Sequence, residues 1–180
     1  MSETIITESV AEAVVFAPLA SLNLGEWVFT ITDEEYQACS KGHIAAGSNR
    51  RADGKRVSIN VEKVGDLPLI VQHYVEDIAE RHHARQISES DLLAGSLEDR
   101  AKARVVWELT ANAIDGATTR LVNRVVVYAM PGFREATEAS GVPFEQFQAV
   151  VKIAMDAHNA EETPLFAKDI TRKAAEGRWA

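Results

Sequence analysis

The sequence predicts an α+β domain in which a curved antiparallel β-sheet precedes and surrounds a long C-terminal helix. The first observation is that, between residues 43 and 129, segments with apolar residues at every second position alternate with Asp-Gly and Gly-Asp pairs. This pattern is typical of consecutive strands joined by short turns. The second observation is that the apolar spacing changes to three and four after residue 143, which is the period of a helix. Strands followed by one long helix favour a sheet that packs around that helix.

Length and composition suit one globular domain spanning residues 1–180. Of these residues, 46% are hydrophobic and 26% are charged, which are ordinary values for a folded protein. The formal net charge of −8 argues against binding to nucleic acid or to an anionic membrane surface. No apolar run approaches the roughly 20 residues of a membrane-spanning helix.

The N-terminal segment and the cysteine content indicate a cytoplasmic protein. The first ten residues, MSETIITESV, have neither the positive start nor the long apolar core of a secretory signal. We expect these residues, 1–10, to be poorly ordered. Cys39 is the only cysteine, so neither an intrachain disulfide nor a cysteine-based zinc site can form.

The first third of the chain contains one ambiguous segment and one short predicted helix. Residues 10–17, VAEAVVFA, fit either a strand or a short helix, because apolar periodicity does not separate the two at this length. Thr32 followed three residues later by Glu35 is a capping-box pattern. It predicts a short helix over residues 33–39.

Two strands are predicted around the turn at residues 53–54, Asp-Gly. Residues 43–47, HIAAG, form a short candidate strand before this turn, and a hairpin connects it to the next strand. In that second strand Val57, Ile59 and Val61 alternate with polar residues. We expect the three apolar side chains to form the buried face of a half-buried strand.

Residues 67–77, LPLIVQHYVED, predict a further strand with a histidine on its apolar face. Because successive side chains of a strand point to opposite faces, Leu69, Val71, His73 and Val75 share one face. Three of the four are apolar, so this face is predicted to be buried. His73 is therefore predicted to point into the interior.

Three more segments complete the predicted sheet. Residues 82–90 form a weaker, more polar strand, and residues 94–102 form a loop. Residues 103–111, ARVVWELTA, alternate clearly, and a turn at Asp115-Gly116 leads to residues 119–129, TRLVNRVVVYA. The last segment is the richest in β-branched residues, which favour strands.

The C-terminal segment predicts a helix with one apolar stripe. Pro143 suits its first turn. Pro164 lacks an N–H, so we expect the helix to kink or restart at that point. The stripe has members spaced by three or four, and Phe166, Ile170 and Ala174 continue it. Its members before Pro164 and directly after it are Phe144, Phe147, Val151, Ala154, His158, Glu162 and Leu165.

The order of these segments resembles the helix-grip fold of the START/Bet v 1/polyketide-cyclase (SRPBCC) superfamily. The resemblance rests on KRVSINVEKV, LPLIVQHYVED, ARVVWELTA, TRLVNRVVVYA and the helix PFEQFQAVVKIAMDAHNAEETPLFAKDI, and it covers residues 43–175. It implies a bent antiparallel sheet that grips the C-terminal helix and leaves an apolar cavity between them. A cone-shaped SnoaL-like fold is the main competitor, but it places its helices before most of the strands.

Three residues are candidates for acid–base chemistry in such a cavity. A buried His73 needs a hydrogen-bond partner and could orient a ligand oxygen or merely satisfy a neighbouring strand. His158 and Glu162 lie four residues apart on the helix stripe, and therefore on one face. Such a pair can fix the imidazole tautomer for general acid–base work, unless the stripe turns both groups to solvent.

The remaining candidates would bind a ligand. In the last strand Asn123 and Arg124 point to opposite faces, so one polar group reaches the interior. Asn123 could bind a ligand or tie strands together. Trp107 could line a pocket or pack in the core. The full set of candidate ligand-binding residues is Tyr74, Trp107, Asn123, Phe147, Val151 and Met155.

The motifs that would indicate a metal or a nucleotide cofactor are missing from the sequence. His82 and His83 are adjacent and would point to opposite faces of a strand, and there is no HExxH pattern. There is also no Gly-rich phosphate loop and no G-x-S-x-G nucleophile elbow. We therefore expect no metal and no cofactor.

Three functions remain open from the sequence. The resemblance implies a protein that binds a hydrophobic or aromatic small molecule, polyketide- or lipid-like, in its cavity. An enzyme on the same scaffold would cyclise, dehydrate or isomerise such a ligand, with a pocket histidine as acid or base. A non-catalytic interaction protein, for example a homodimer, would use its apolar helix face for assembly. The fold alone does not choose among them.

Overall fold

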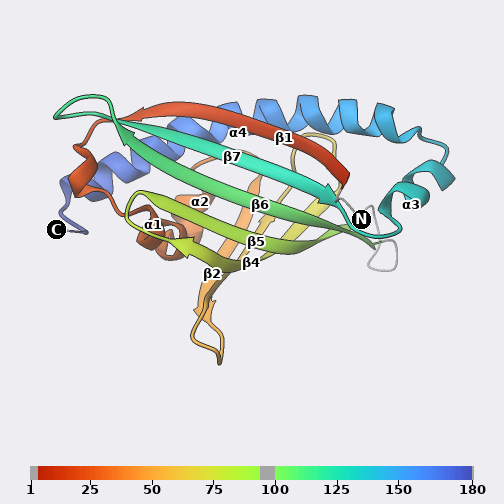
Figure 1. Cartoon of the computed structure of the whole chain (residues 1–180), viewed down its shortest axis with the longest axis horizontal. Coiled ribbons are helices and arrows are strands. Elements are labelled where there is room, and N and C mark those ends of the chain that lie inside the picture. Colours follow the sequence, from red (N-terminus) through yellow and green to blue (C-terminus); the bar gives the residue numbers. More distant parts are fainter. Residues whose placement is uncertain (1–3, 94–99, 180) are drawn as a thin grey trace.

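A computed structural model describes residues 4–93 and 100–179, which form one antiparallel sheet, four α-helices and a short 3-10 helix (Leu19–Ser21) (Figure 1). The seven strands lie in the order β1-β7-β6-β5-β4-β3-β2. They are β1 (Thr4–Val15), β2 (His43–Arg50), β3 (Arg56–Glu62), β4 (Leu69–Ala79), β5 (His83–Leu93), β6 (Arg100–Ala113) and β7 (Thr119–Ala129). The helices are α1 (Leu24–Thr30), α2 (Asp33–Gln37), α3 (Phe133–Ala139) and α4 (Phe144–Ala175).

The sheet curves around the long helix, as the sequence predicts. In Figure 1, α4 runs behind the β1–β7 side of the sheet, α1 and α2 lie toward one end, and α3 lies at the other. The α+β helix-grip architecture, with short helices in the N-terminal third, is therefore confirmed. None of the helices in the described part of the chain is long and apolar enough to cross a membrane.

The N-terminal segment is a strand and not a poorly ordered tail. β1 pairs antiparallel with β7 from Thr4 opposite Ala129 to Val15 opposite Thr119. Of the two alternatives for residues 10–17, the strand is thus correct up to Val15. The expectation of poor order over residues 1–10 is wrong for residues 4–10, because these residues pair with β7 along one edge of the strand; residues 1–3 lie outside the described residues.

The predicted short helix is present and begins where the capping box places it. In α2 the Thr32 hydroxyl accepts a hydrogen bond from the Glu35 backbone N–H, and the Glu35 carboxylate accepts one from the Thr32 N–H. These reciprocal bonds satisfy two of the N–H groups that a helix start leaves free. The following segment then enters β2 at His43, directly behind α2.

The two faces of β3 and β4 are the reverse of the prediction. Ser58, Asn60 and Glu62 are buried, whereas Ile59 is 49% exposed. In β4, Tyr74 is buried and His73 lies on the outer face. Val, Ile and other β-branched residues fit a pleated surface on either face. Their alternation here therefore predicts the strands but does not predict which face of each strand is buried. The inner surface of these two strands combines polar side chains such as Asn60, Glu62 and Gln72 with Ile70 and Tyr74.

The connection between β5 and β6 and the long helix also differ in part from expectation. Residues 94–99 of the predicted loop lie outside the described residues, and residues 100–102 belong to β6. α4 continues through Pro164 as one helix and does not restart. Its buried residues include Phe144, Val151 and His158 from the predicted stripe.

The interior is packed solidly near α1. Phe166 of α4 lies with its ring centroid 5.0 Å from Trp27 and 5.6 Å from Trp107. Leu22 and Leu24 also have no exposed surface.

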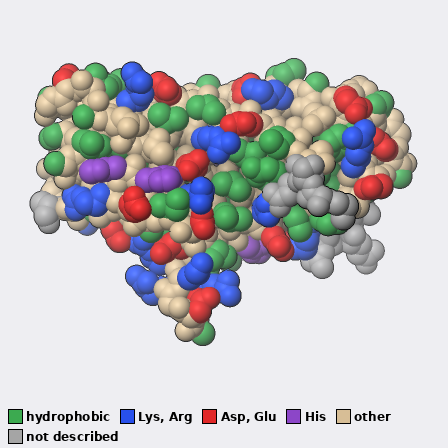
Figure 2. All heavy atoms as spheres, viewed as in Figure 1, with side chains coloured by type: hydrophobic (Ala, Val, Ile, Leu, Met, Phe, Trp, Pro, Cys, Tyr) green, Lys and Arg blue, Asp and Glu red, His purple; other side chains and the backbone are tan. Residues whose placement is uncertain are grey.

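The outer surface, unlike the interior, is rich in charged side chains. Figure 2 shows acidic and basic side chains mixed with apolar ones, and Lys and Arg gather on the projecting β2–β3 hairpin.

Candidate functional site

A cavity of about 300 Å³ separates the inner face of the sheet from α3 and the first half of α4. Ala136, Ser140 and Val142, which border it, are exposed to solvent, so the cavity opens beside α3. Most of its wall is apolar. The apolar lining comes from several strands and both helices and includes Ile6, Val64, Leu67, Ile70, Leu92, Val105, Val127 and Phe133.

The long helix contributes three of the predicted ligand-binding residues to this cavity. Phe147, Val151 and Met155 all line it, because their spacing of four places them on the inward face of α4. Val151 and Met155 are buried, with 6% and 9% of their surface exposed. Their contact with a ligand stays a prediction.

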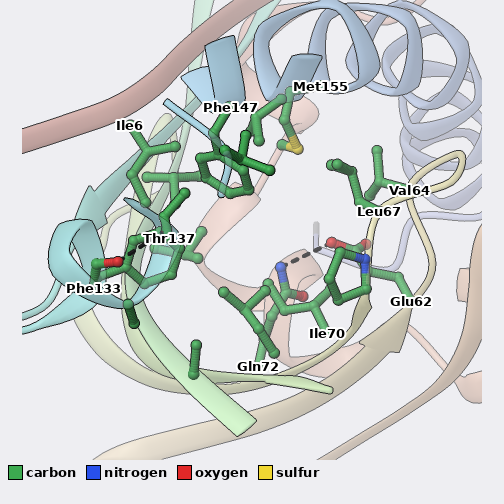
Figure 3. Close-up of a pocket in the computed structure, with 18 of the residues that line it drawn as sticks. Ile6, Glu62, Val64, Leu67, Ile70, Gln72, Phe133, Thr137, Phe147 and Met155 are labelled. Carbon is green, nitrogen blue, oxygen red and sulfur yellow. Dashed lines mark hydrogen bonds between the residues drawn. The ribbon is translucent and has the colours of Figure 1, made fainter. Parts of the chain in front are cut away.

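Two polar side chains stand at the inner end of the cavity. Glu62 and Gln72 project from β3 and β4, and the Gln72 Nε2 donates a hydrogen bond to Glu62 Oε1 at 2.9 Å. Figure 3 shows this pair across the cavity from Phe133 and Thr137. The cavity is thus apolar along its length and polar at its inner end.

A second hollow, of about 20 Å³, continues from this polar end. It shares Glu62, Gln72 and Met155 with the large cavity. A hollow of this size holds about one water molecule. Its remaining lining residues include four that the sequence predicts as site residues, namely Tyr74, Trp107, His158 and Glu162.

Beside the small hollow, two histidines and two glutamates meet; we call His43, Glu62, His158 and Glu162 the inner cluster. His43 Nε2 lies 3.0 Å from Glu162 Oε2 and 3.6 Å from Glu62 Oε2. His158 Nε2 lies 3.3 Å from Glu162 Oε2 and 3.5 Å from Glu62 Oε2. The His43 side chain has no exposed surface, and the other three are each 7% exposed.

Each member of the inner cluster is held from behind by another polar group. His43 Nδ1 lies 2.7 Å from the Tyr36 carbonyl oxygen, the Tyr36 hydroxyl donates to Glu62 Oε2 at 2.9 Å, and His158 Nδ1 lies 3.4 Å from the Ser40 hydroxyl. Asn123 Nδ2 donates to Glu162 Oε1 at 3.0 Å. These contacts fix the orientations of both rings and both carboxylates.

Burial and charge act in opposite directions on the inner cluster. Burial alone lowers the pKa of His158, but the Glu162 and Glu62 carboxylates outweigh it and raise that pKa above its ordinary value. Burial raises the pKa of Glu162, but His158 and His43 outweigh it and hold that pKa well below its usual range. The phenol of Tyr36 has a raised pKa because it is buried and lies near the same carboxylates.

Asn123 is the inward residue of its pair, and it joins three elements. Its Oδ1 accepts a hydrogen bond from Trp107 Nε1 at 2.8 Å, and its Nδ2 also donates to Thr163 Oγ1 at 3.1 Å. Arg124 points outward and pairs with Glu8. Because these partners come from β6 and α4, the contacts of Asn123 fit the alternative in which it ties neighbouring elements together.

The prediction that His73 faces the interior is wrong. Its side chain is 46% exposed on the outer face of the sheet, where Nε2 lies 3.2 Å from Asp91 Oδ2. The cavity lies on the opposite face, lined by the neighbouring Gln72. His73 therefore has no access to a ligand in this cavity.

The sequence reasoning missed His43 and Glu62 as site residues. They come from neighbouring strands, and the β2–β3 register places His43 opposite Glu62. A bulge between His43 and Ala45 creates this pairing, since the regular register from the turn would place Ile44 there. The adjoining His158 comes from α4, so no linear spacing indicates the group.

Comparison with known proteins gives matches in structure only. No family model and no curated protein sequence matches the chain. The ZhuI aromatase/cyclase of Streptomyces sp. R1128 superposes with a TM-score of 0.63 at 11% identity, covering 93% of this chain and 94% of that one. A protein of Thermus thermophilus gives 0.60 at 15% identity, with 92% and 98% covered.

A further match is the two-domain aromatase/cyclase BexL from the BE-7585A biosynthetic pathway. The TM-score is 0.55 at 14% identity, and the match covers 92% of this chain and 50% of that one. At such identities the likeness concerns the fold alone. The chain shares the helix-grip fold of these aromatase/cyclases, which confirms, for the fold, the resemblance found in its sequence.

Proposed function

We propose that the protein binds a hydrophobic or aromatic small molecule in the cavity between the sheet and α4. The observation that carries this proposal is the cavity itself: about 300 Å³, apolar along its length, with Glu62 and Gln72 at the inner end. Ligand sites combine apolar walls with a few polar groups that fix orientation. A cavity at the lower end of the usual size range suits a compact ligand.

The arrangement of the wall also indicates how such a ligand would lie. Its apolar body would contact Phe147, Val151 and Met155, and a hydroxyl or carbonyl at its leading end would face Glu62 and Gln72. The fold shared with ZhuI and BexL supports a polyketide-like aromatic compound as the first class to test. A lipid-like compound with one polar end would satisfy the same wall.

A pair of matched substitutions on α4 tests this proposal. Val151→Phe would fill the cavity, whereas Val150→Phe changes the neighbouring residue, which is 53% exposed. We expect an apolar fluorophore, 1-anilinonaphthalene-8-sulfonate, to bind the wild-type protein and Val150→Phe alike, and Val151→Phe at least tenfold more weakly. Native mass spectrometry of the freshly purified protein would identify a co-purified ligand. Equal fluorophore binding by both variants would contradict the proposal.

A second candidate function is catalysis on a ligand in the same cavity, as a cyclase, dehydratase or isomerase. It is favoured by the position of His158 and Glu162 in the small hollow at the inner end of the cavity. A catalyst and a binder differ in which molecule co-purifies. If the protein is a catalyst, His158→Gln should retain a small molecule that differs in mass or fragmentation from the one retained by the wild type. A binder should retain the same molecule in both.

The interaction-protein alternative is the least supported of the three. This alternative predicts a protein without an internal cavity, whereas the described residues line one. A homodimer stays a prediction for measurement of the mass in solution. We also propose that the protein acts in the cytoplasm, for which the acidic composition and the single cysteine are the supporting observations.

A further inference from the structure

The geometry points to a binding site for one divalent metal ion of the zinc class in the inner cluster, with His43, Glu62 and His158 as ligands and Glu162 as the fourth. In the described part of the chain, His43, Glu62 and His158 offer ligand atoms that all lie within 4.8 Å of one another. Glu162 Oε2 lies 3.0 Å and 3.3 Å from the two imidazole Nε2 atoms. The inference concerns the inner cluster itself and holds whether or not the cavity binds an organic ligand.

The distances suit ligands around a small ion. Ligand atoms about 2.0–2.1 Å from a tetrahedral zinc ion lie about 3.3–3.4 Å from one another. The four nitrogen–oxygen distances within the inner cluster run from 3.0 to 3.6 Å. Shifts of the His43, Glu62 and His158 side chains, whose ligand atoms already lie within 4.8 Å of one another, would therefore bring these three atoms into bonding range of one ion, and Glu162 Oε2 would approach as the fourth ligand from the side of the two imidazoles.

The contacts of His43 leave its Nε2 facing a carboxylate oxygen. Its Nδ1 faces the Tyr36 carbonyl at 2.7 Å, and a carbonyl only accepts, so Nδ1 carries the hydrogen. In the neutral ring Nε2 is then an acceptor, yet it lies 3.0 Å from a carboxylate oxygen. Two facing lone pairs repel unless a proton or a metal ion lies between them. A zinc-binding histidine usually binds the metal through one ring nitrogen and donates a hydrogen bond from the other, and the Nδ1 contact of His43 leaves its Nε2 for such a role.

His158 supplies a second, independent observation. It is 93% buried, and its Nε2 has no hydrogen-bond partner of good geometry although two carboxylates lie within 3.5 Å. Its Nε2 lies at similar distances from both oxygens, 3.5 Å from Glu62 Oε2 and 3.3 Å from Glu162 Oε2. A buried polar atom without a partner is costly, and a metal ion between the carboxylates would satisfy it.

Charge and space are consistent with one divalent ion. Glu62 and Glu162 place two carboxyl groups side by side with two imidazoles in a buried environment, and a buried carboxylate requires a compensating charge. The adjoining hollow of about 20 Å³ has room for a water molecule bound to the ion. Two imidazoles with two carboxylates favour zinc or a similar transition metal over Mg²⁺ or Ca²⁺, which prefer oxygen ligands.

The site would lie where the organic ligand ends. Glu62 lines both the large cavity and the small hollow. An ion held by Glu62 would thus stand at the polar end of the cavity, within reach of an oxygen atom of a bound molecule. The outer oxygens of Glu62 and Glu162 are already held by Gln72 and Asn123, as supporting contacts of metal ligands commonly are.

The test is metal analysis of the full chain purified without a polyhistidine tag. Protein treated with a chelator, then exposed to Zn²⁺ and freed of excess metal, should retain about one equivalent of zinc. X-ray absorption of that sample should show only nitrogen and oxygen ligands at about 2.0–2.1 Å, including two imidazoles. Replacement with Co²⁺ should give the intense visible bands of a four-coordinate ion.

Two variants assign the ion to the inner cluster. His158→Gln should weaken zinc binding at least tenfold in competition with a coloured chelator. His73→Gln, on the outer face, should leave it unchanged. The inference is overturned if the wild-type protein retains no zinc and gives no such Co²⁺ spectrum, or if His73→Gln loses zinc as His158→Gln does. If His158→Gln does not fold, the wild-type absorption spectrum still decides, because one imidazole or none among the ligands excludes this site.

Discussion

Histidine–carboxylate contacts lie on both sides of the sheet. On the inner face, His43 and His158 lie 3.0 and 3.3 Å from Glu162. On the outer face, His73 lies 3.2 Å from Asp91. The distances are alike, but the inner side chains are 0–7% exposed and His73 is 46% exposed. The comparison teaches that burial, and not contact distance, decides what such a pair contributes.

The physical reason lies in solvent screening. Water around an exposed ion pair weakens the attraction, so that the pair contributes roughly 0–1 kcal/mol to stability. In a buried cluster each charge has lost its hydration, so removal of one partner leaves an uncompensated charge that costs about 3–5 kcal/mol. The inner cluster is therefore a place where charge must be balanced, by protons or by a metal ion.

The largest expected effect comes from His158→Leu. The substitution leaves Glu62 and Glu162 with His43 as their remaining imidazole partner. We expect the free energy of unfolding to fall by about 3–5 kcal/mol. Urea unfolding of chelator-treated protein measures this effect without a contribution from bound metal. A loss below about 1 kcal/mol would mean that the inner cluster behaves like a surface pair.

The fold could be predicted from the sequence because it depends on the periodicity of apolar residues. The site depends on the pairing register of the strands and on which face of each strand is buried. The alternation of residues 57–61 and 69–75 identified the strands correctly. It misplaced the interior because Ile59 lies outside and Glu62 inside. In residues 103–111 the apolar face is the inner one, and Val105, Trp107 and Leu109 are buried there.

The members of the site differ in how far they could be predicted. His158 and Glu162 lie one helical turn apart, so their common face follows from their spacing. His43 meets Glu62 only because a bulge shifts the end of β2 by one residue. Bulges are local irregularities that redirect side chains, and the hydrophobic pattern of β2 gives no sign of this one.

A smaller, pH-dependent effect is expected for Glu108 on the outer face. Burial raises its pKa, but hydrogen bonds from His83 and Arg124 outweigh burial and lower it. A carboxylate with a depressed pKa stabilises the folded state above its unfolded pKa of about 4.3 and loses this contribution as the pH falls. Glu108→Gln should thus cost up to about 1 kcal/mol near neutral pH.

The pH dependence separates this effect from a general structural disturbance. Urea unfolding of the wild type and of Glu108→Gln should give stabilities that converge as the pH is lowered from about 7 toward about 3. The difference should be largest at the upper end, where the wild-type carboxylate is fully ionised. A difference that stays constant over this range would mean that the charge of Glu108 contributes nothing.

The smallest effect is expected from His73→Leu, the outer counterpart of His158→Leu. Asp91 keeps a second partner, since Lys102 Nζ lies 3.2 Å from its Oδ1, so the substitution leaves no isolated charge. His73 is also half exposed, and water can hydrate whatever the ring no longer contacts. We expect the free energy of unfolding to change by less than about 0.5 kcal/mol in urea unfolding. If His73→Leu lowers the free energy of unfolding as much as His158→Leu does, burial does not explain the difference between the two faces of the sheet. The burial of the inner cluster would then no longer support a bound metal ion.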